Sequence, residues 1–355
     1  MPETRIVIPR VGGPEVLTLE PFAPTPPESG EVAIDVRAVG VNFADLFCRL
    51  GLYAAAPPWP FAPGFEVAGV VAGVGSDVAA PRVGERVIGV LRFGGYATRV
   101  HVPAAWTRPL PNGWSFAEGA AFPVAFLTAW YGLIHQGRLA RGETAVIHSA
   151  AGGVGSAACQ LARHSGARVL GTVGSEAKRA AALAAGADEI VVSPTYDVWA
   201  EIDRLTAGRG VDVVFDAVGG RGLAAGYRRL RPMGRLIVYG FAEMMPRGGL
   251  RNWPALAWRR LRTPHFDPLD MTGKNRAVIG FNLVHLFDRD EPLGRGFDEL
   301  LALARAGALR PVVGATVPFE RAADAHRLLQ SRASTGKVVL VREEAADRPP
   351  AVSPA

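Results

Sequence analysis

Residues 144–160 are the segment whose spacing points most clearly to chemistry. They read TAVIHSAAGGVGSAACQ, an apolar run followed by a glycine loop and a helix-forming stretch. This is a G-x-G-x-x-G pattern with Ala150 in the place of the first glycine. Gly152 would let the backbone approach a pyrophosphate and Gly155 would let the helix pack on the strand, while the helix N-terminus offers N–H groups to the anion. The predicted dinucleotide loop is Ala151, Gly152, Gly153, Val154 and Gly155; a glycine-rich turn with a structural role only is the alternative.

The end of the next predicted strand indicates which dinucleotide would bind. NAD sites usually carry an acid there for the ribose 2′-hydroxyl, but the sequence reads GTVGSEAK from Gly171. A hydroxyl at Ser175 and a cation at Lys178 suit a 2′-phosphate instead. Lys178 is one of only three lysines, which favours a specific role over an ordinary solvated side chain. The sequence therefore predicts NADPH; Glu176 weakens this prediction, although it can point to solvent at the start of the helix.

Alternating strands and helices surround this loop. Predicted strands cover 144–149, 167–173, 189–192, 211–218 and 235–240, and predicted helices cover 157–164, 178–185, 198–206 and 223–230. This spacing predicts right-handed βαβ units and a parallel sheet. The first third is different, with short Val- and Ile-rich strands at 4–9, 31–41, 66–74 and 85–90 between glycines and prolines. A last segment, with helices at 297–306 and 320–331 and strands at 311–317 and 337–341, is expected to complete the first domain.

The composition excludes several classes of protein. The 355 residues are 49% hydrophobic and 20% charged, which excludes disorder and collagen-like repeats. The net charge is +6, but the arginines are spread along the whole chain with acidic residues among them, unlike the clustered charge of a nucleic-acid-binding protein. Two cysteines cannot form a disulfide framework or a four-cysteine zinc site. The N-terminus has no apolar signal-peptide core, and the apolar run 119–134 falls short of a membrane span, so a cytoplasmic location is expected.

Several further segments carry a family resemblance. They are GVNFADLFCRLGLY, PGFEVAGVV, VGERV, GGYATRVHVP, AAGGVGS, VVFDAVGG and STGKVVLV. In this order and spacing, they resemble the zinc-independent quinone oxidoreductases of the medium-chain dehydrogenase/reductase superfamily. RRLRPMGRLIVYG and NRAVIGFNL resemble the branch that contains homologues of the synaptic-vesicle amine transport protein.

The resemblance implies an α/β fold with two domains. A GroES-like catalytic β domain would cover 1–124 and be completed by 291–345, a doubly wound Rossmann domain would cover 125–290, and 346–355 would be a flexible tail. The active site would lie between the domains. The resemblance also implies further cofactor residues: Thr128, Tyr196, Gly219, Gly240, Phe241, Phe281, Asn282 and Arg332, of which Tyr196 and Arg332 would hold the 2′-phosphate. For Arg332, simple solvation near a helix end remains an alternative.

The same resemblance indicates that no metal is used. Zinc-dependent members have a cysteine where this chain has Asn42, and a histidine where it has Phe65 in Gly64-Phe65-Glu66. Zinc needs three or four N, S or O ligands, and the seven histidines lack ligand spacing. Catalysis would then depend on an electron-poor acceptor, with the Asn42 amide donating to a developing oxyanion and Asp45 orienting it. The alternative is that Asn42 and Asp45 only cap a short helix.

Tyr53 has two interpretations. In the related enoyl thioester reductases, a tyrosine in a similar Gly-x-Tyr setting is a proton donor, and an aromatic residue in the wall of the cleft is the alternative. The quinone-reductase pattern VNFxDxY ends here in Phe47, so one quinone-specific hydroxyl is missing.

The expected function is an NADPH-dependent, zinc-independent reductase that transfers hydride to a quinone or an α,β-unsaturated carbonyl. The alternative is a non-catalytic NADPH-binding protein that contacts lipid, a membrane surface or a partner through residues 247–262. That segment places Leu250, Trp253, Ala257 and Leu261 near helical spacing among arginines, which fits an apolar lid over the substrate better than membrane contact. A homodimer through the strand at 278–283 is also expected.

Overall fold

The computed structural model describes the chain except residues 1, 194, 196, 247–252, 288–289 and 343–355. Its internal contacts divide it into two compact units. The first takes in residues 1–124 and the chain from Asp290 onward, and the second runs from Ala125 to Arg289. The predicted tail, 346–355, lies outside the described residues.

Antiparallel strands dominate the first unit. Its strands are β1 (Thr4–Val7), β2 (Thr18–Pro21), β3 (Glu31–Val41), β4 (Glu66–Val74), β5 (Arg86–Val90), β6 (Arg99–Pro103), β7 (Thr107–Pro109), β14 (Val313–Pro318) and β15 (Lys337–Val341). The main sheet has the order β14-β15-β3-β4-β5-β7, with β6 also pairing with β3, and β1 and β2 form a separate ribbon. The C-terminal return that the sequence predicted is therefore present as β14 and β15.

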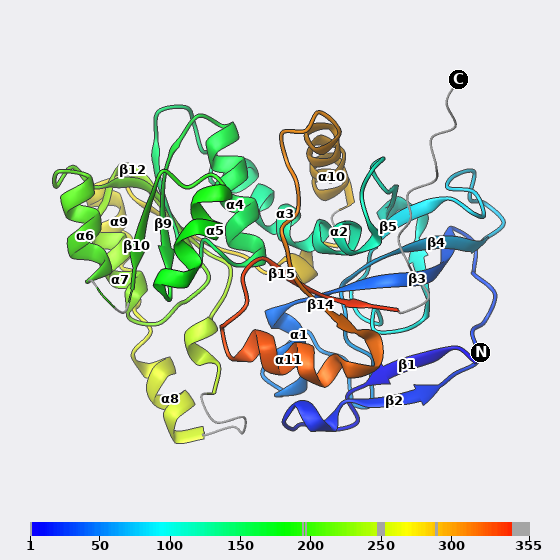
Figure 1. Cartoon of the computed structure of the whole chain (residues 1–355). Coiled ribbons are helices and arrows are strands. Elements are labelled where there is room, and N and C mark those ends of the chain that lie inside the picture. The colour runs from blue at the N-terminus through cyan, green and yellow to red at the C-terminus, as the bar shows by residue number, and fades with distance from the viewer. Residues whose placement is uncertain (1, 194, 196, 247–252, 288–289, 343–355) are drawn as a thin grey trace. The chain divides into compact units, whose positions relative to one another are not determined.

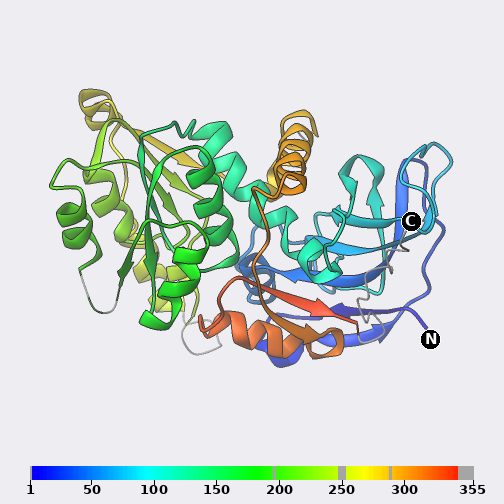
Figure 2. The ribbon, with the colours of Figure 1, turned by 45° about the horizontal axis from the view of Figure 1, so that its top comes forward.

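Four helices belong to the first unit: α1 (Phe43–Arg49), α2 (Phe116–Ala121), α10 (Asp290–Arg305) and α11 (Ala322–Gln330). Figure 2 shows α11 running alongside β14 and β15, which it contacts. It is amphipathic and buries Ala322, Ala325 and His326.

Strand register brings three distant residues to one place in this sheet. Val338 of β15 pairs with Val41 of β3, so Lys337 comes next to Asn42. On the other side of β3, Val67 of β4 pairs with Val39, so Glu66 comes next to Gly40. The order β15-β3-β4 thus gathers Lys337, Asn42 and Glu66.

The second unit contains a six-stranded parallel sheet. Its order is β10 (Glu189–Val192), β9 (Arg168–Val173), β8 (Thr144–Ile147), β11 (Val211–Asp216), β12 (Leu230–Val238) and β13 (Ala277–Gly280). Helices α4 (Gly153–His164) and α5 (Arg179–Ala184) lie on one side, and α6 (Val198–Leu205) and α7 (Gly222–Arg228) on the other (Figure 1). The chain order reverses between β8 and β11, the position where doubly wound sheets bind their ligands. The predicted Rossmann fold is confirmed.

Hydrophobic side chains from strands and helices form the core of this unit. Trp199 and Ile202 of α6 and Tyr227 of α7 are buried against β8, β11 and β12. Two further helices, α8 (Trp253–Leu261) and α9 (Pro268–Lys274), follow β12. The sequence did not predict α9, whose N-cap is Asp267 and whose first residue is Pro268.

The helical stretch from Phe116 to Gln136 is apolar enough, at a mean hydropathy of 1.2, and long enough, at 21 residues, to cross a membrane. It comprises α2, α3 (Pro123–Ala129) and a π-helical segment, η3 (Trp130–Gln136). The sequence run 119–134 was expected to be too short, and this expectation is wrong because the helix extends beyond it at both ends. Since 72% of the apolar window is buried inside the structure, the stretch has the burial of a core helix.

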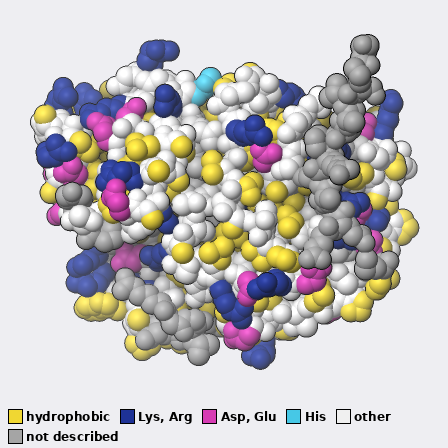
Figure 3. Space-filling model, viewed as in Figure 1, with side chains coloured by type: hydrophobic (Ala, Val, Ile, Leu, Met, Phe, Trp, Pro, Cys, Tyr) yellow, Lys and Arg dark blue, Asp and Glu magenta, His cyan; other side chains and the backbone are white. Residues whose placement is uncertain are grey.

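Charges of both signs lie interspersed over most of the face shown in Figure 3. Many arginines are paired with nearby acids, as in Arg168 with Glu189 and Arg229 with Asp203. Many of the positive charges are therefore compensated locally.

Candidate functional site

The glycine loop joins β8 to α4 in the second unit. A Cβ on Gly155 would lie 2.1 Å from the carbonyl oxygen of Ser149, so only glycine lets the helix come this close. Ser149 itself turns the chain with a φ of 57°, and Gly152 is the extended N-cap residue. Gly152 has no side chain with which to cap α4, and Gly152, Gly153 and Val154 are half-buried. The loop therefore presents backbone N–H groups of a helix N-terminus, as an anion site requires.

Ser175 and Lys178 follow the end of β9. Ser175 is the N-cap of a short 3₁₀ turn, η4 (Glu176–Lys178), and Lys178 is half-buried. Burial lowers the pKa of the Lys178 ammonium. Glu176 points away to solvent and pairs with Arg179, which lowers the pKa of its carboxyl. Glu176 is thus exposed to solvent, and its negative charge is compensated by Arg179.

Behind the loop, His148 and Asp216 form a buried pair that the sequence did not reveal. His148 directly follows β8, and its Nδ1 lies 2.9 Å from Thr172 Oγ1, while its Nε2 lies 3.6 Å from Asp216 Oδ2. Asp216 ends β11, and its Oδ1 accepts the backbone N–H groups of Val218 and Gly219 at 2.6 and 2.7 Å. The pair therefore holds together the loops that follow the two strands at the switch point.

The other predicted cofactor residues fall into three groups. Gly219 follows β11, and Gly240 and Phe241 follow β12. A Cβ on Gly219 would lie 2.9 Å from Phe241 Cδ1, so the structure brings these two loops together. Phe281 and Asn282 follow β13, and Thr128 is buried in α3. Arg332 belongs to the first unit, where it is exposed beyond α11 with a φ of 58°. Tyr196 lies outside the described residues.

Asn42, Glu66 and Lys337 form a buried polar cluster in the first unit. The Lys337 ammonium lies 2.5 Å from both Asn42 Oδ1 and Glu66 Oε1. Asn42 Nδ2 donates to Glu66 Oε1 at 2.9 Å, and Glu66 Oε2 accepts the backbone N–H of Val124 at 2.8 Å. The exposed fractions of the three residues are only 8%, 0% and 5%. Sequence reasoning did not select Glu66 or Lys337.

This cluster fixes the orientation of the Asn42 amide. Because an ammonium can only donate, the atom of Asn42 that faces Lys337 must be its oxygen. The amide nitrogen then donates to Glu66 and, at the longer distance of 3.3 Å, to the Gly40 carbonyl. Both N–H groups of the Asn42 amide therefore have acceptors. Donation to an oxyanion would replace the longer bond, the one to the Gly40 carbonyl.

Asp45 caps the backbone from inside the structure. Its Oδ2 accepts the N–H of Asn42 at 2.7 Å and its Oδ1 accepts the N–H of Gly64 at 2.9 Å. The carboxyl is fully buried, and this burial raises its pKa to about 7. Nearby, burial and then the charge of Asp45 raise the pKa of Tyr96, whose hydroxyl lies 3.1 Å from His326 Nε2. Asp45 thus holds the backbone at Asn42 and Gly64, and sequence reasoning missed the buried Tyr96–His326 pair near it.

Tyr53 stands at the edge of an aromatic group. Its ring centroid lies 6.1 Å from that of Phe65 and 6.5 Å from that of Phe93, both in edge-on geometry. Phe61 packs on Phe93 in the same way at 5.8 Å. Tyr53 is half-buried, so its position fits a wall residue and leaves the proton-donor role open.

Two conserved-domain families match the chain. One is the alcohol dehydrogenase GroES-like domain, over residues 28–112, and the other is described as zinc-binding dehydrogenase, over residues 153–292. The synaptic vesicle membrane protein VAT-1 homolog of Rattus norvegicus is 39% identical over 339 residues, 95% of this chain and 83% of the relative. The chain belongs to the medium-chain dehydrogenase/reductase superfamily.

Solved structures of this superfamily agree with the fold. Escherichia coli quinone oxidoreductase complexed with NADPH superposes with a TM-score of 0.83 at 31% identity, covering 95% of this chain and 99% of that one. CurK enoyl reductase gives a TM-score of 0.81 at 30% identity, covering 96% and 100%. The GroES-like and Rossmann architectures that the resemblance implied are confirmed, as is the position near the VAT-1 branch.

In this medium-chain dehydrogenase/reductase, Asn42 and Phe65 occupy the positions where the resemblance placed the cysteine and histidine of zinc-dependent members. Asn42 is held by an ammonium and a carboxylate, and Phe65 packs among aromatic rings. Among the residues that the structure describes, no three His, Cys, Asp or Glu side chains lie close enough to hold a metal ion. The two buried histidines of the site regions, His148 and His326, have hydrogen-bond partners in the fold.

Proposed function

We propose that this protein is an NADPH-dependent reductase that transfers hydride, without a metal ion, to a quinone or an α,β-unsaturated carbonyl. Its membership of an oxidoreductase superfamily supports the reaction class, and the relatives include a quinone oxidoreductase and an enoyl reductase. Bound NADPH would supply the hydride. Both kinds of acceptor are electron-poor, so they accept hydride without a Lewis acid.

One observation carries the preference for NADPH. The strand β9 ends without an acid and is followed by the hydroxyl of Ser175 and the cation of Lys178, while the nearby Glu176 is engaged by Arg179. A 2′-phosphate carries about −1.5 to −2 charges, which such donors stabilise and an acid would repel. The glycine loop at the N-terminus of α4 fits the pyrophosphate, since Gly152 leaves space and α4 supplies N–H groups.

Asn42 would polarise the acceptor oxygen. Lys337 and Glu66 hold its amide in one orientation, so little reorganisation is needed when negative charge develops. The donor available for this purpose is the N–H that now reaches the Gly40 carbonyl at 3.3 Å. Asp45 positions Asn42 through its backbone, and water or the Tyr53 hydroxyl would supply the proton.

The first experiment is an assay of NADPH oxidation against an ortho-quinone, a para-quinone and a conjugated enal, with NADH in parallel. Faster turnover with NADPH supports the proposal, and the preferred acceptor distinguishes quinone from enal chemistry. Equal rates with both cofactors would contradict the role given to Ser175 and Lys178. NADPH binding without turnover on the whole panel would favour the second candidate below.

The second candidate is a non-catalytic NADPH-binding protein that contacts lipid, a membrane surface or a partner through residues 247–262. The observation in its favour is the exposure of α8, where Trp253, Trp258 and Leu261 are 60%, 58% and 76% exposed beside several arginines. Leu256 is the buried residue of this helix, so the apolar face expected from the sequence points largely to solvent. Residues 247–252, and with them Leu250, lie outside the described residues.

Liposome co-sedimentation tests this candidate with phosphatidylcholine vesicles and with vesicles containing an anionic lipid. The wild-type chain is compared with Trp253→Ala/Leu261→Ala and with the control Leu269→Ala, which alters an equally exposed leucine on α9. Binding that only the first variant loses supports membrane contact. Absence of binding, or binding that survives in both variants, contradicts it.

We also propose a cytoplasmic homodimer. Both cysteines are buried free thiols, as suits a reducing compartment. Strand β13 is the edge of the parallel sheet and has half-buried residues at Ala277, Val278 and Ile279, so a second copy could extend the sheet there. Light scattering of Val278→Pro against wild type tests this: a dimer that becomes monomeric supports the proposal, and a wild-type monomer contradicts it.

A further inference from the structure

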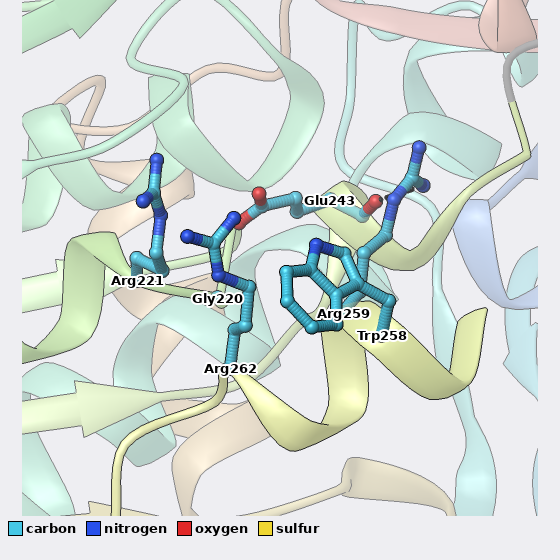
Figure 4. A pocket seen from close by; sticks show the side chains of 6 residues that line it. All are labelled: Gly220, Arg221, Glu243, Trp258, Arg259 and Arg262. Atoms are coloured by element: carbon cyan, nitrogen blue, oxygen red, sulfur yellow. Dashed lines mark hydrogen bonds between the residues drawn. The ribbon is translucent and has the colours of Figure 1, made fainter. Parts of the chain in front are cut away.

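A pocket of about 230 Å³ lies in the second unit, on the side of α8. The loop after β11 contributes Gly220 and Arg221, the turn after β12 contributes Glu243, and α8 with its C-terminal end contributes Trp258, Arg259 and Arg262 (Figure 4). None of the residues assigned above to the NADPH phosphates lines it. Its volume is below the range of about 300–1,000 Å³ usual for drug-sized ligands, so it would fit a small molecule or one end of a larger one.

Charge is the pocket's most informative property. Three arginines and one glutamate line the pocket, which gives these side chains a net charge of +2 if each is ionised. Within the part of the chain that the structure describes, the guanidinium groups of Arg221 and Arg262 have neither a hydrogen bond nor an ion pair. Six arginines elsewhere in the unit form ion pairs, as Arg229 does with Asp203. Two uncompensated guanidinium groups at one pocket therefore favour an anionic ligand.

The remaining contacts hold the pocket in place. Arg259 Nη1 donates to the carbonyl oxygens of Glu243 and Met245 at 2.6 and 3.1 Å, which ties α8 to the turn after β12. A Cβ on Gly220 would lie 1.5 Å from Glu243 Oε2, so the glycine, at a φ of 67°, makes room for the carboxylate. Glu243 thus lies against the backbone of the loop, and Figure 4 shows the guanidinium groups of Arg221 and Arg262 on the side of its carboxylate, with that of Arg259 at the other end of Glu243.

Trp258 adds an apolar wall to the charged groups. Its side chain is largely exposed, and Arg262 lies over its ring at 4.8 Å from the centroid. An exposed indole beside guanidinium groups offers a face on which a planar group can stack. The pocket therefore combines an anion site with a stacking surface.

We propose that this pocket binds a soluble phosphate monoester that carries a planar apolar group, as a ligand distinct from the dinucleotide. The net charge of +2 matches the charge of about −1.5 to −2 that a phosphate monoester carries at pH 7. Guanidinium forks at Arg221 and Arg262 bind phosphate oxygens in pairs, and Trp258 stacks on the planar group. The site belongs to the second unit alone and does not depend on reductase activity.

The test is a calorimetric titration of the full chain with phenyl phosphate, inorganic phosphate and phenol, in the absence of any acceptor. Phenyl phosphate is expected to bind about tenfold more tightly than inorganic phosphate, and phenol is expected not to bind. Arg221→Ala and Arg262→Ala should each weaken phenyl phosphate binding about tenfold or more, since each removes a charge-assisted hydrogen-bond pair. Trp258→Ala should remove the advantage of phenyl phosphate over inorganic phosphate.

Arg260→Ala is the matched control, because Arg260 is an exposed arginine on the same helix that does not line the pocket. It should bind phenyl phosphate as the wild type does. Circular dichroism on each variant checks that the chain as a whole remains folded.

Four outcomes would overturn the proposal. The first is that phenyl phosphate does not bind at millimolar concentration, and the second is that Arg260→Ala and Arg262→Ala weaken its binding equally. The third is that NADPH fully displaces phenyl phosphate. The fourth is that the chain binds only to vesicles that contain phosphatidic acid. The third outcome would assign the anion to the cofactor site and the fourth would assign the arginines to a membrane surface. None of them depends on hydride transfer, so the pocket and the reductase proposal can fail separately.

Discussion

The ammonium of Lys337 lies 2.5 Å from Glu66 Oε1, and both side chains are almost completely buried. The two residues come from β15 and the start of β4, on either side of β3. A buried pair of this kind is costly to break because the remaining charge has no solvent. Here it also holds the amide of Asn42.

Lys337→Met is therefore expected to lower the free energy of unfolding by about 3–5 kcal/mol, since it leaves the Glu66 carboxylate buried without its partner. Urea unfolding measures this loss. Adding Glu66→Gln to Lys337→Met should recover part of the stability, because it removes the orphaned charge. Lys274→Met is the control, as Lys274 is half-exposed in a pair with Asp270, and should cost less than about 1 kcal/mol. Equal losses in the two lysine variants would contradict the importance of the buried pair.

Asn42→Ala tests the proposed oxyanion donor. Turnover should fall about 10²–10³-fold while NADPH affinity stays within about twofold, because the lost hydrogen bond acts on developing charge. Stopped-flow reduction of the best quinone and NADPH fluorescence titration provide the two measurements. Asn112→Ala, in an exposed turn, is the control. Unchanged turnover in a folded Asn42→Ala protein would remove Asn42 from the mechanism and leave it a structural role in the cluster.

Gly155→Ala tests the close approach of α4 to the glycine loop. Its Cβ would meet the Ser149 carbonyl oxygen at 2.1 Å, so the backbone must move. We expect a loss of about 1–3 kcal/mol in unfolding free energy, the usual cost of overpacking, and weaker NADPH binding. Gly222→Ala is the control, because no atom lies within 4 Å of its added Cβ. NADPH affinity equal to wild type in Gly155→Ala would contradict binding at this helix N-terminus.

Lys178→Ala tests the cofactor preference. The KM for NADPH should rise about tenfold or more, the effect of one charge-assisted hydrogen bond, while the KM for NADH stays unchanged. Steady-state kinetics with both cofactors measure the split, and Lys274→Ala controls for the loss of a lysine elsewhere. A similar rise for both cofactors would mean that Lys178 does not contact the 2′-phosphate.

The Rossmann half of the fold was accessible from the sequence. Predicted strands starting at 144, 189 and 211 begin at those residues as β8, β10 and β11. Strand β12 differs: it begins at Leu230 and not at 235, because its pairing with β11 contains a register shift. Its sequence Pro232-Met233-Gly234, with Met233 at a φ of 68°, is typical of a turn and hid the first half of the strand.

The polar cluster of the first unit was less accessible, for a physical reason. Lys337 and Asn42 are 295 residues apart, and only the pairing of β15 with β3 brings them together. No local pattern encodes such a pairing. A usable signal was nevertheless present, since Lys337 is one of three lysines and directly precedes the apolar run VVLV. A charged residue at the start of a buried strand predicts a buried partner.

Asp45 gives a prediction for stability as a function of pH. Burial raises its pKa from 3.8 to about 7, so the folded protein keeps this proton over a range in which the unfolded chain has lost it. The contribution of the group to stability is therefore complete below pH 4, decreases as the pH rises from about 4 to 7, and stays lost above pH 7. Asp45→Asn cannot titrate and escapes this loss, although it gives up one acceptor for the N–H groups of Asn42 and Gly64.

The difference in unfolding free energy between Asp45→Asn and wild type should thus increase by a few kcal/mol between pH 4.5 and 7.5. Each unit by which the pKa of Asp45 differs between the folded and unfolded states contributes about 1.4 kcal/mol. Urea unfolding at four pH values measures it. Asp77→Asn, at an exposed aspartate, should show a small and constant difference. A constant difference for Asp45→Asn as well would mean that the N–H groups of Asn42 and Gly64, together with the charge of Lys337, keep the carboxylate ionised despite its burial.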